Sequence, residues 1–272
     1  MAEERSRGFA DASVPDAYDR YLTPHLFEPW ARELVARAGL REGAAVLDVA
    51  SGPGCVAWGA ARVVGSAGRV VASDISPVML AVAAARPAEP GSAPIEYVEC
   101  AAASIAADDH SFDAVMCQQG LQFFPDRLAA VREIRRVARP SGVVVVSTWA
   151  AEHRLGLFGP IADVLREFGM DEPYPRASDA TSYALDAAYL QALLRDGGLR
   201  EIAVETVQLD AAWPNVEDAV ATILGTPFGP QVRALPAESQ RQIWAMLAER
   251  LERSSDGMVT VCTTSNVGRG IK

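Results

Sequence analysis

The sequence is short of cysteine, histidine and positive charge, and each shortage excludes a class of protein. Its 272 residues include four cysteines, without a Cys-x-x-Cys pair, and three histidines, so we expect no metal site and a reducing, cytoplasmic setting. The formal net charge of −10 argues against nucleic acid and against an anionic membrane surface as partners. No apolar run approaches the roughly 18 residues of a membrane span, and the charged residues 1–13 do not resemble a signal peptide.

What the sequence does contain is an alternation of apolar segments and helical patterns. Half of the residues are hydrophobic, which is enough for a sizeable core. Continuously apolar strands separated by helices predict a parallel sheet that is covered on both faces, and such sheets bind ligands beyond the carboxyl ends of their strands. The predicted strands are 44–50, 69–74, 95–100, 112–117 and 143–150, and the predicted helices are 55–64, 76–86 and 126–138.

The two ends of the chain are predicted to be largely helical. The segment from Tyr18 to Ala38 has apolar residues near helical spacing, and we expect Pro24 and Pro29 to break it into two pieces. Beyond residue 150 the alternation loosens. Helices are predicted at 155–169, 185–198, 216–225 and 237–253, and strands at 199–210 and 257–272.

A glycine-rich segment, VLDVASGPGCVAWGAA, indicates a nucleotide cofactor. Gly52, Gly54 and Ala57 fit the G-x-G-x-x-G/A spacing of dinucleotide sites, and Asp74 follows about 20 residues later, as that motif requires. Asp48, however, lies at the end of the preceding strand, where its carboxylate would repel a pyrophosphate and attract an amine. A ribose, an ammonium group and no phosphate are the features of S-adenosylmethionine, which we therefore favour over NAD.

Four motifs in order resemble one enzyme family. VLDVASGPG, VVASDIS, YVECAAASIAADDHSFDAVMCQQGLQFFPD and VREIRRVARPSGVVVVSTW are similar to the motifs of class I S-adenosylmethionine-dependent methyltransferases of the ubiquinone/menaquinone-biosynthesis type. The resemblance covers roughly residues 40–150. It implies an α/β fold with a Rossmann-like, seven-stranded, mostly parallel sheet of order 3-2-1-4-5-7-6, whose last strand is antiparallel. It also implies one domain with a helical lid at 1–38, a cofactor-binding core at 39–150, and helical insertions with the last two strands at 151–272.

The resemblance also assigns cofactor roles. Asp48, with the backbone near Ala50 and Gly52, would hold the methionine end, and Gly54 would let the backbone approach closely. The remaining positions form the ribose, adenine and sulfonium contacts: Asp74 for the two ribose hydroxyls, Ile75 for the adenine face, Ala101 and Ala102 for the adenine edge, and Gln118 for the surroundings of the sulfonium.

Two positions depart from the family pattern. Ala50 stands where the family's loop usually begins with a glycine, and we expect its φ to stay below zero so that the methyl group is tolerated. Ala101 stands near the place where many relatives carry an acid that accepts from the adenine amino group. Backbone groups are expected to replace that acid, with Glu99 and Ser104 as possible substitutes.

The resemblance places the methyl acceptor among aromatic and uncharged side chains, which favours a small aromatic or apolar molecule. Since the sulfonium is already an excellent leaving group, the enzyme mainly aligns the acceptor and excludes water. His153 is the candidate base if the acceptor has to lose a proton. Core positions suit Trp149 and Phe123 at least as well as pocket positions do. The predicted acceptor residues are Tyr18, Tyr21, His25, Gln119, Phe123 and Trp149.

Two other functions stay open. A relative of this fold that binds the cofactor without transferring its methyl group would keep the same cofactor site. An NAD-dependent oxidoreductase would keep the glycine spacing. The sequence leaves the oligomeric state and the acceptor atom open.

Overall fold

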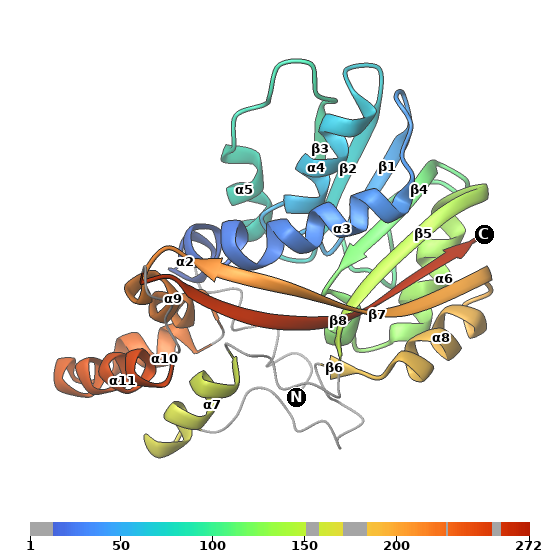
Figure 1. Cartoon of the computed structure of the whole chain (residues 1–272). Helices are drawn as coiled ribbons and strands as arrows, with labels where there is room; N and C mark the ends of the chain where they lie inside the picture. Colours follow the sequence, from blue (N-terminus) through green and yellow to red (C-terminus); the bar gives the residue numbers. More distant parts are fainter. Residues whose placement is uncertain (1–12, 151–157, 171–183, 227, 252–256) are drawn as a thin grey trace.

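The computed structural model describes residues 13–150, 158–170, 184–226, 228–251 and 257–272, and a mixed sheet runs through its centre (Figure 1). The strand order is β3-β2-β1-β4-β5-β8-β7. Neighbouring strands from β3 to β5 are parallel, and β8 is antiparallel to both β5 and β7. The strands are β1 (Ala45–Val49), β2 (Arg69–Asp74), β3 (Ile95–Glu99), β4 (Phe112–Gln118), β5 (Ala138–Ala150), β7 (Arg200–Trp213) and β8 (Val259–Ile271).

This order confirms the predicted topology, with β7 and β8 as the predicted sixth and seventh strands. Three details differ. A two-residue strand, β6 (Ala184–Leu185), was not predicted and pairs with the end of β5. Strand β5 begins at Ala138 instead of residue 143, because a register shift in β4 lets Phe112 pair with Ala138. Strand β7 continues three residues beyond 210, because it stays paired with β8 as far as Trp213.

Helices cover both faces of the sheet and divide the core into two layers. Successive strand residues point to opposite faces, so Val46 joins the layer under the N-terminal helices and α4, whereas Leu47 joins the layer under α6 and α8. Side chains cap three of these helices, with Ser76, Asp126 and Asp186 accepting from backbone N–H groups of the first turn. The helices are α4 (Cys55–Val64), α5 (Pro77–Ala85), α6 (Arg127–Val137) and α8 (Ala187–Asp196).

The N-terminal segment is helical, as predicted, but it forms three pieces and not the two expected from Pro24 and Pro29. It consists of α2 (Ser13–Tyr21), the π-helical turn η1 (Thr23–Phe27) and α3 (Glu28–Ala38). Pro24 and Pro29 lie in the first turns of η1 and α3, where a missing N–H costs no helical hydrogen bond. Helix α3 crosses the sheet. Figure 1 shows α2 at the N-terminal end of α3, beside the helices of residues 216–234.

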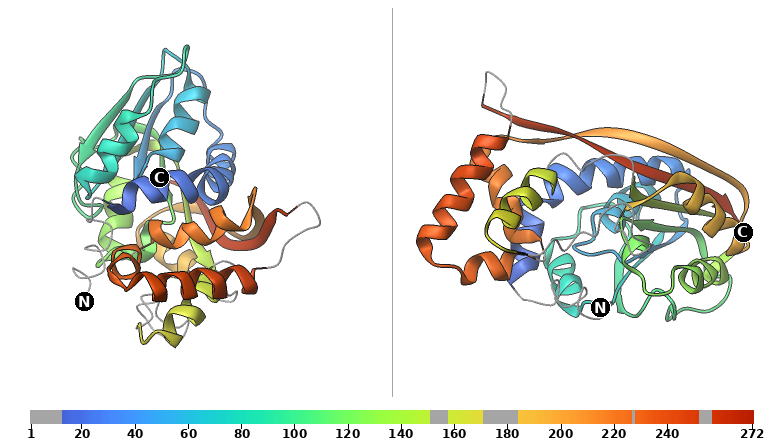
Figure 2. Two further views of the ribbon diagram at one scale, coloured as in Figure 1. Left: turned by 90° about the vertical axis from the view of Figure 1, so that its left-hand side faces the viewer. Right: turned by 90° about the horizontal axis from the view of Figure 1, so that it is seen from below.

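A group of helices from the second half of the chain lies against α2 at one end of the molecule (Figure 2). The backbones meet directly, because a Cβ at Gly225 would lie 2.7 Å from the Cα of Tyr18. The Trp213 indole N–H also donates to the Tyr21 carbonyl oxygen at 2.8 Å. The group comprises α7 (Phe158–Glu167), α9 (Val216–Ala221), η3 (Thr222–Gly225), α10 (Gly229–Ala234) and α11 (Ala237–Arg250).

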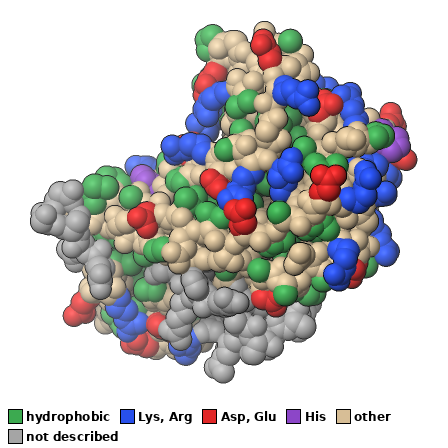
Figure 3. Space-filling model, turned by 45° about the vertical axis from the view of Figure 1, so that its right-hand side comes forward, with side chains coloured by type: hydrophobic (Ala, Val, Ile, Leu, Met, Phe, Trp, Pro, Cys, Tyr) green, Lys and Arg blue, Asp and Glu red, His purple; other side chains and the backbone are tan. Residues whose placement is uncertain are grey.

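The surface carries both signs of charge. On the face that Figure 3 shows, Lys and Arg side chains alternate with Asp and Glu side chains, without a continuous basic patch. Ion pairs join some of them, such as Arg69 with Glu96 at 3.1 Å. All four cysteines are free. Within the described part of the chain, no helix is both long and apolar enough to cross a membrane.

Candidate cofactor and acceptor site

The glycine-rich turn joins the carboxyl end of β1 to the start of α4. The Ser51 N–H donates to the Ser73 carbonyl oxygen of the neighbouring strand at 3.0 Å, which fixes the turn on the sheet edge. Gly54 has φ 87°, and a Cβ there would lie 3.2 Å from the Ala83 Cβ and 3.3 Å from the Trp58 ring. Both the conformation and the lack of space therefore require glycine at this position.

The carboxyl group of Asp48 is buried, and only one of its two oxygens has a hydrogen-bond partner within the described residues. Its Oδ2 accepts from the Ala57 N–H at 3.0 Å. Its Oδ1 is buried and has no hydrogen-bond partner within the described residues. Burial raises the pKa of the Asp48 carboxyl to about 8, against the Ala57 hydrogen bond, and the nearby Asp74 carboxylate contributes to the rise. A buried, unpaired carboxylate oxygen is costly unless a ligand supplies a donor, and a cationic donor suits it best.

Asp74 follows at the end of β2 and organises the same turn. Its Oδ2 accepts from the Gly52 N–H and its Oδ1 from the Ser76 N–H, both at 2.8 Å. Burial raises the pKa of this carboxyl, and these backbone hydrogen bonds oppose the rise. Since each carboxylate oxygen has a second lone pair, Asp74 is able to accept from two further hydroxyl groups. Ile75 beside it is 63% exposed, which leaves an apolar surface bare next to the carboxylate.

Ala50 departs from our expectation, because its φ is 55° and not negative. A residue with a Cβ pays about 1–2 kcal/mol for this left-handed conformation. Gly120 makes room for the methyl group, since a Cβ at Gly120 would lie 2.8 Å from the Ala50 Cβ. Gln119, which precedes that glycine, is also left-handed, with φ 51°. The turn after β1 and the loop after β4 are therefore fitted to each other.

The loop after β3 carries the predicted adenine-edge residues. Ala101 is exposed and Ala102 half-buried. The Cys100 N–H donates to the Asp74 carbonyl oxygen at 3.1 Å, so the loop begins beside the predicted ribose site. Glu99 and Ser104, the possible substitutes for the family's acid, are both exposed.

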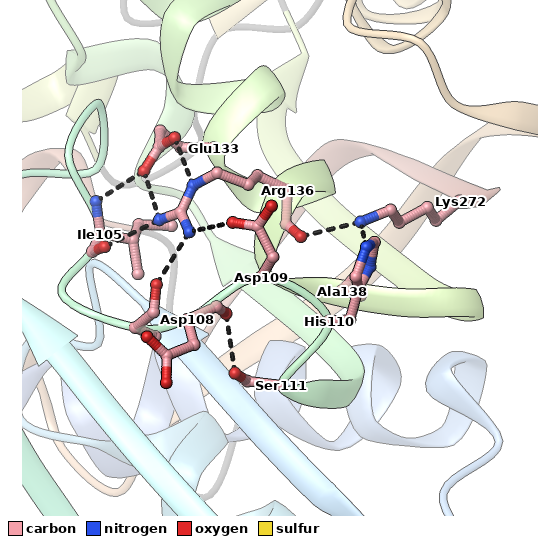
Figure 4. Close-up of polar contacts among 10 residues, drawn as sticks. Ile105, Asp108, Asp109, His110, Ser111, Glu133, Arg136, Ala138 and Lys272 are labelled. Atoms are coloured by element: carbon pink, nitrogen blue, oxygen red, sulfur yellow. Dashed lines mark hydrogen bonds and ion pairs between the residues drawn. The ribbon is translucent and has the colours of Figure 1, made fainter.

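The side chain of Arg136 in α6 holds residues 105–109 of this loop in place (Figure 4). Its guanidinium donates to the carbonyl oxygens of Ile105 at 2.9 Å and Ala107 at 2.8 Å, and to the carboxylates of Glu133 and Asp109. Glu133 in turn accepts from the Ile105 N–H at 3.0 Å. These carboxylates raise the pKa of Arg136. We did not predict this pair of residues. The Glu–x–x–Arg spacing on α6 was the available signal, although it does not indicate which loop the pair holds.

Gln118 ends β4 and presents an acceptor oxygen. Its Nε2 donates to the Phe27 carbonyl oxygen at 3.0 Å, which settles the orientation of the amide. Its Oε1 is buried and has no partner in the described part of the chain. Because β1 and β4 are parallel neighbours, their carboxyl ends lie side by side. Asp48 and Gln118 therefore both place an unpaired acceptor oxygen at this end of the strands. This arrangement fits a ligand with an ammonium group and a sulfonium centre, as S-adenosylmethionine has.

Aromatic side chains of the N-terminal helices and of β5 pack together beside the carboxyl ends of these strands. Tyr18 stacks on Phe27, with ring centroids 4.8 Å apart, and Phe27 lies 6.2 Å from Trp149. Trp30 meets Trp149 edge-on at 6.1 Å and donates its indole N–H to the Thr263 Oγ1 at 3.0 Å. Tyr18 and Trp149, both predicted acceptor residues, thus belong to one aromatic group. Sequence reasoning missed Phe27 and Trp30 in this group, since nothing in a helical pattern distinguishes them from core residues.

The other predicted acceptor residues make separate contacts. The ring of His25 lies 5.8 Å from the ring of Trp213, between centroids. Tyr21 has the Arg20 guanidinium 5.2 Å from its ring centre. Phe123 is 38% exposed, whereas Gln119 is buried and donates to the Ser265 Oγ at 2.8 Å. His153, the predicted base, lies outside the described residues.

Comparisons with known proteins show the family of this chain. A model of the ubiE/COQ5 methyltransferase family matches residues 12–154, more than half of the chain. An uncharacterized protein of Mycobacterium tuberculosis is 32% identical over 255 residues, which cover 88% of this chain and 85% of the relative. The ubiquinone/menaquinone biosynthesis C-methyltransferase UbiE of Cellvibrio japonicus is 32% identical over 157 residues, which cover 56% of this chain and 63% of the relative.

Solved structures share the fold. Phosphoethanolamine N-methyltransferase 2 of Haemonchus contortus, in complex with phosphomonomethylethanolamine and S-adenosylhomocysteine, has a TM-score of 0.64 at 18% identity, over 99% of this chain and 59% of that one. An S-adenosylmethionine-dependent methyltransferase of Aquifex aeolicus has a TM-score of 0.55 at 23% identity, over 72% of this chain and 92% of that one. The family model covers more than half of the chain, so the chain belongs to the ubiE/COQ5 methyltransferase family, whose cofactor is S-adenosylmethionine and not NAD.

Proposed function

We propose that the enzyme transfers the methyl group of S-adenosylmethionine to a small, uncharged aromatic acceptor of the phenol or quinol type. The observation that carries this proposal is the aromatic group of Tyr18, Phe27 and Trp149, which is joined to the sheet edge through the hydrogen bond between Gln118 and Phe27. Aromatic rings pack favourably on such a group. The names of the UbiE relatives, which refer to ubiquinone and menaquinone biosynthesis, support the same class of acceptor.

Each residue of the cofactor edge has a proposed role. Asp48 pairs with the ammonium group through its free Oδ1, and Asp74 accepts from the ribose hydroxyls. Gln118 directs its free Oε1 toward the sulfonium. The other contacts belong to backbone and apolar groups: Ala50, Gly52 and Gly54 along the methionine end, Ile75 on the adenine face, and Ala101 and Ala102 at the adenine edge.

When bound, S-adenosylmethionine supplies an electrophilic methyl group with a neutral thioether as its leaving group. The protein's part is to align the acceptor in line with that methyl group and to exclude water, which the buried rings of Phe27 and Trp149 favour. His153 remains the proposed base for an acceptor that has to lose a proton. The four free cysteines support the proposal that the enzyme works in the cytoplasm.

Incubation with methyl-labelled S-adenosylmethionine and a panel of phenols and quinols tests the proposal. We expect label in at least one of these acceptors. If S-adenosylhomocysteine binds tightly and no acceptor receives label, the chain is instead a member of the family that binds the cofactor without transferring its methyl group.

A further inference from the structure

Three buried polar side chains lie together where β4, β5 and β8 meet. Ser147 and Trp149 are two residues apart on β5 and so share one face of the sheet. Ser265 of β8 is paired directly with Trp149 and lies on the same face. Gln119, just beyond β4, reaches this face and donates its Nε2 to the Ser265 Oγ at 2.8 Å. The cluster of Gln119, Ser147 and Ser265 therefore adjoins the aromatic group.

The hydrogen bonds of this cluster are incomplete. The Gln119 Oε1 and the Ser147 Oγ are buried and have no partner among the described residues. The Ser265 Oγ accepts from Gln119, so its hydroxyl proton remains to be donated. Buried polar groups in folded proteins are normally paired, by protein, water or ligand. Gln119 also keeps a left-handed backbone, with φ 51°, and such outliers concentrate at binding and catalytic sites.

The chemistry of the cluster selects an uncharged partner. All three side chains are neutral, and their neighbour Trp149 is aromatic and only 5% exposed. An ionised carboxylate or phosphate would have to give up its water here without receiving a countercharge from the cluster, which is strongly unfavourable. A hydroxyl oxygen, in contrast, both donates and accepts, and so matches a free amide oxygen next to a free serine hydroxyl.

We propose that Gln119, Ser147 and Ser265 bind one uncharged hydroxyl group of the methyl acceptor. The hydroxyl donates to the Gln119 Oε1 and accepts from a serine hydroxyl, while the ring that carries it packs on the aromatic group. This inference rests on the proposed function, to which it adds a specificity determinant: the acceptor enters as a neutral ring with an oxygen, and not as an anion.

Equilibrium dialysis of three probes against the protein saturated with S-adenosylhomocysteine tests the inference. The probes are 1-naphthol, naphthalene and 1-naphthoate, which share a ring system and carry a hydroxyl group, no polar group and a carboxylate. We expect 1-naphthol to bind about tenfold more tightly than naphthalene, as a buried hydrogen bond provides, and 1-naphthoate to bind most weakly. Ser265→Ala, which also removes the partner of Gln119, should weaken 1-naphthol binding about tenfold and leave naphthalene binding unchanged.

Thr260→Ala is the matched control, because Thr260 lies on the same strand but is exposed; it should change neither affinity. An unchanged affinity for S-adenosylhomocysteine verifies that the variants are folded. Equal affinity for 1-naphthol and naphthalene would overturn the inference and would indicate that water completes the cluster. An equal loss of both in Ser265→Ala would also overturn it, because the substitution would then act on the ring site as a whole. If neither ring binds while S-adenosylhomocysteine does, the proposed aromatic acceptor fails, and the inference falls with it.

Discussion

The two halves of the site are built in different ways. At the ends of β1 and β2, the proposed cofactor half is made of backbone N–H groups held by two acids that lie within 22 residues of the groups they bind, as in the contacts of Asp48 with Ala57 and of Asp74 with Gly52. At the ends of β4, β5 and β8, the proposed acceptor half is made of side chains from distant segments, such as Gln119 and Ser265, which are 146 residues apart. Local construction produces a motif that is visible in sequence, whereas distant construction does not.

The largest expected effect comes from a substitution that disrupts only the proposed cofactor half of the site. Asp74→Ala removes a carboxylate that accepts two backbone hydrogen bonds and the proposed ribose contacts. Two hydrogen bonds to a charged group contribute about 3 kcal/mol or more, so affinity for S-adenosylhomocysteine should fall about a hundredfold by calorimetry. Asp196→Ala on α8, an exposed acid, is the control and should bind normally. An unchanged affinity in Asp74→Ala would mean that the ribose is held elsewhere.

The next effect is a pH dependence that Asp48 should impose on the cofactor half. Below its pKa of about 8 the free protein carries Asp48 neutral, so binding of an ammonium group requires the loss of a proton. Affinity for S-adenosylhomocysteine should therefore rise by up to about tenfold per pH unit between pH 6 and 8, and then level off. Calorimetry in buffers of different ionisation enthalpy measures the released proton. Asp48→Asn should abolish the slope, and a flat profile in the wild type would contradict the account.

The same carboxyl has a stability effect of defined sign. Its pKa in the folded protein lies above that of an unfolded aspartate, so the folded state binds the proton more tightly. The contribution of Asp48 to stability is complete below the unfolded pKa and is lost as the pH rises through the folded value. The unliganded protein should thus unfold at lower urea concentration at pH 9 than at pH 6, and Asp48→Asn should reduce this difference.

A smaller effect concerns the contact between the two halves, where Ala50 faces Gly120. Gly120→Ala would place a Cβ 2.8 Å from the Ala50 Cβ and 3.0 Å from the Cys117 Sγ, and we expect it to lower the free energy of unfolding by about 2 kcal/mol. Ala50→Gly should raise it by about 1 kcal/mol, because the left-handed strain disappears. Urea unfolding of both single variants and of the double variant completes the cycle. Additive effects would show that the two positions are not in contact.

The smallest effect concerns the loop after β3. Arg136→Lys keeps the charge but loses most of the contacts to Ile105, Ala107 and Asp109. Affinity for S-adenosylhomocysteine should fall only about threefold, since the loop then has to be ordered on binding. Faster amide hydrogen exchange at Ile105 provides the independent readout. Arg132→Lys, an exposed position on the same helix, should change neither, and equal behaviour of the two variants would remove Arg136 from any role in positioning the loop.

The contrast between the halves also explains what could be predicted from sequence. Pro24 and Pro29 act on their own helices, and each lies in the first turn of a helical piece, although the segment forms three pieces and not the predicted two. The strand order could be predicted because the four family motifs occur in a characteristic order along the chain. The positive φ of Ala50 could not be foreseen, because the space for its methyl group depends on Gly120, 70 residues away. The pairing of Trp30 with Thr263, 233 residues apart, likewise depends on how the strands and the N-terminal helices pack.

The most direct test measures the affinity for both ligands in one variant of each half of the site. S-adenosylhomocysteine and 1-naphthol are titrated into Asp74→Ala and Ser265→Ala, with 1-naphthol measured at a saturating concentration of S-adenosylhomocysteine. We predict that Asp74→Ala loses about a hundredfold in affinity for S-adenosylhomocysteine and keeps its affinity for 1-naphthol, while Ser265→Ala shows the reverse pattern, with about a tenfold loss for 1-naphthol alone. If each variant weakens both ligands to the same extent, the division of the site into a cofactor half and an acceptor half is wrong.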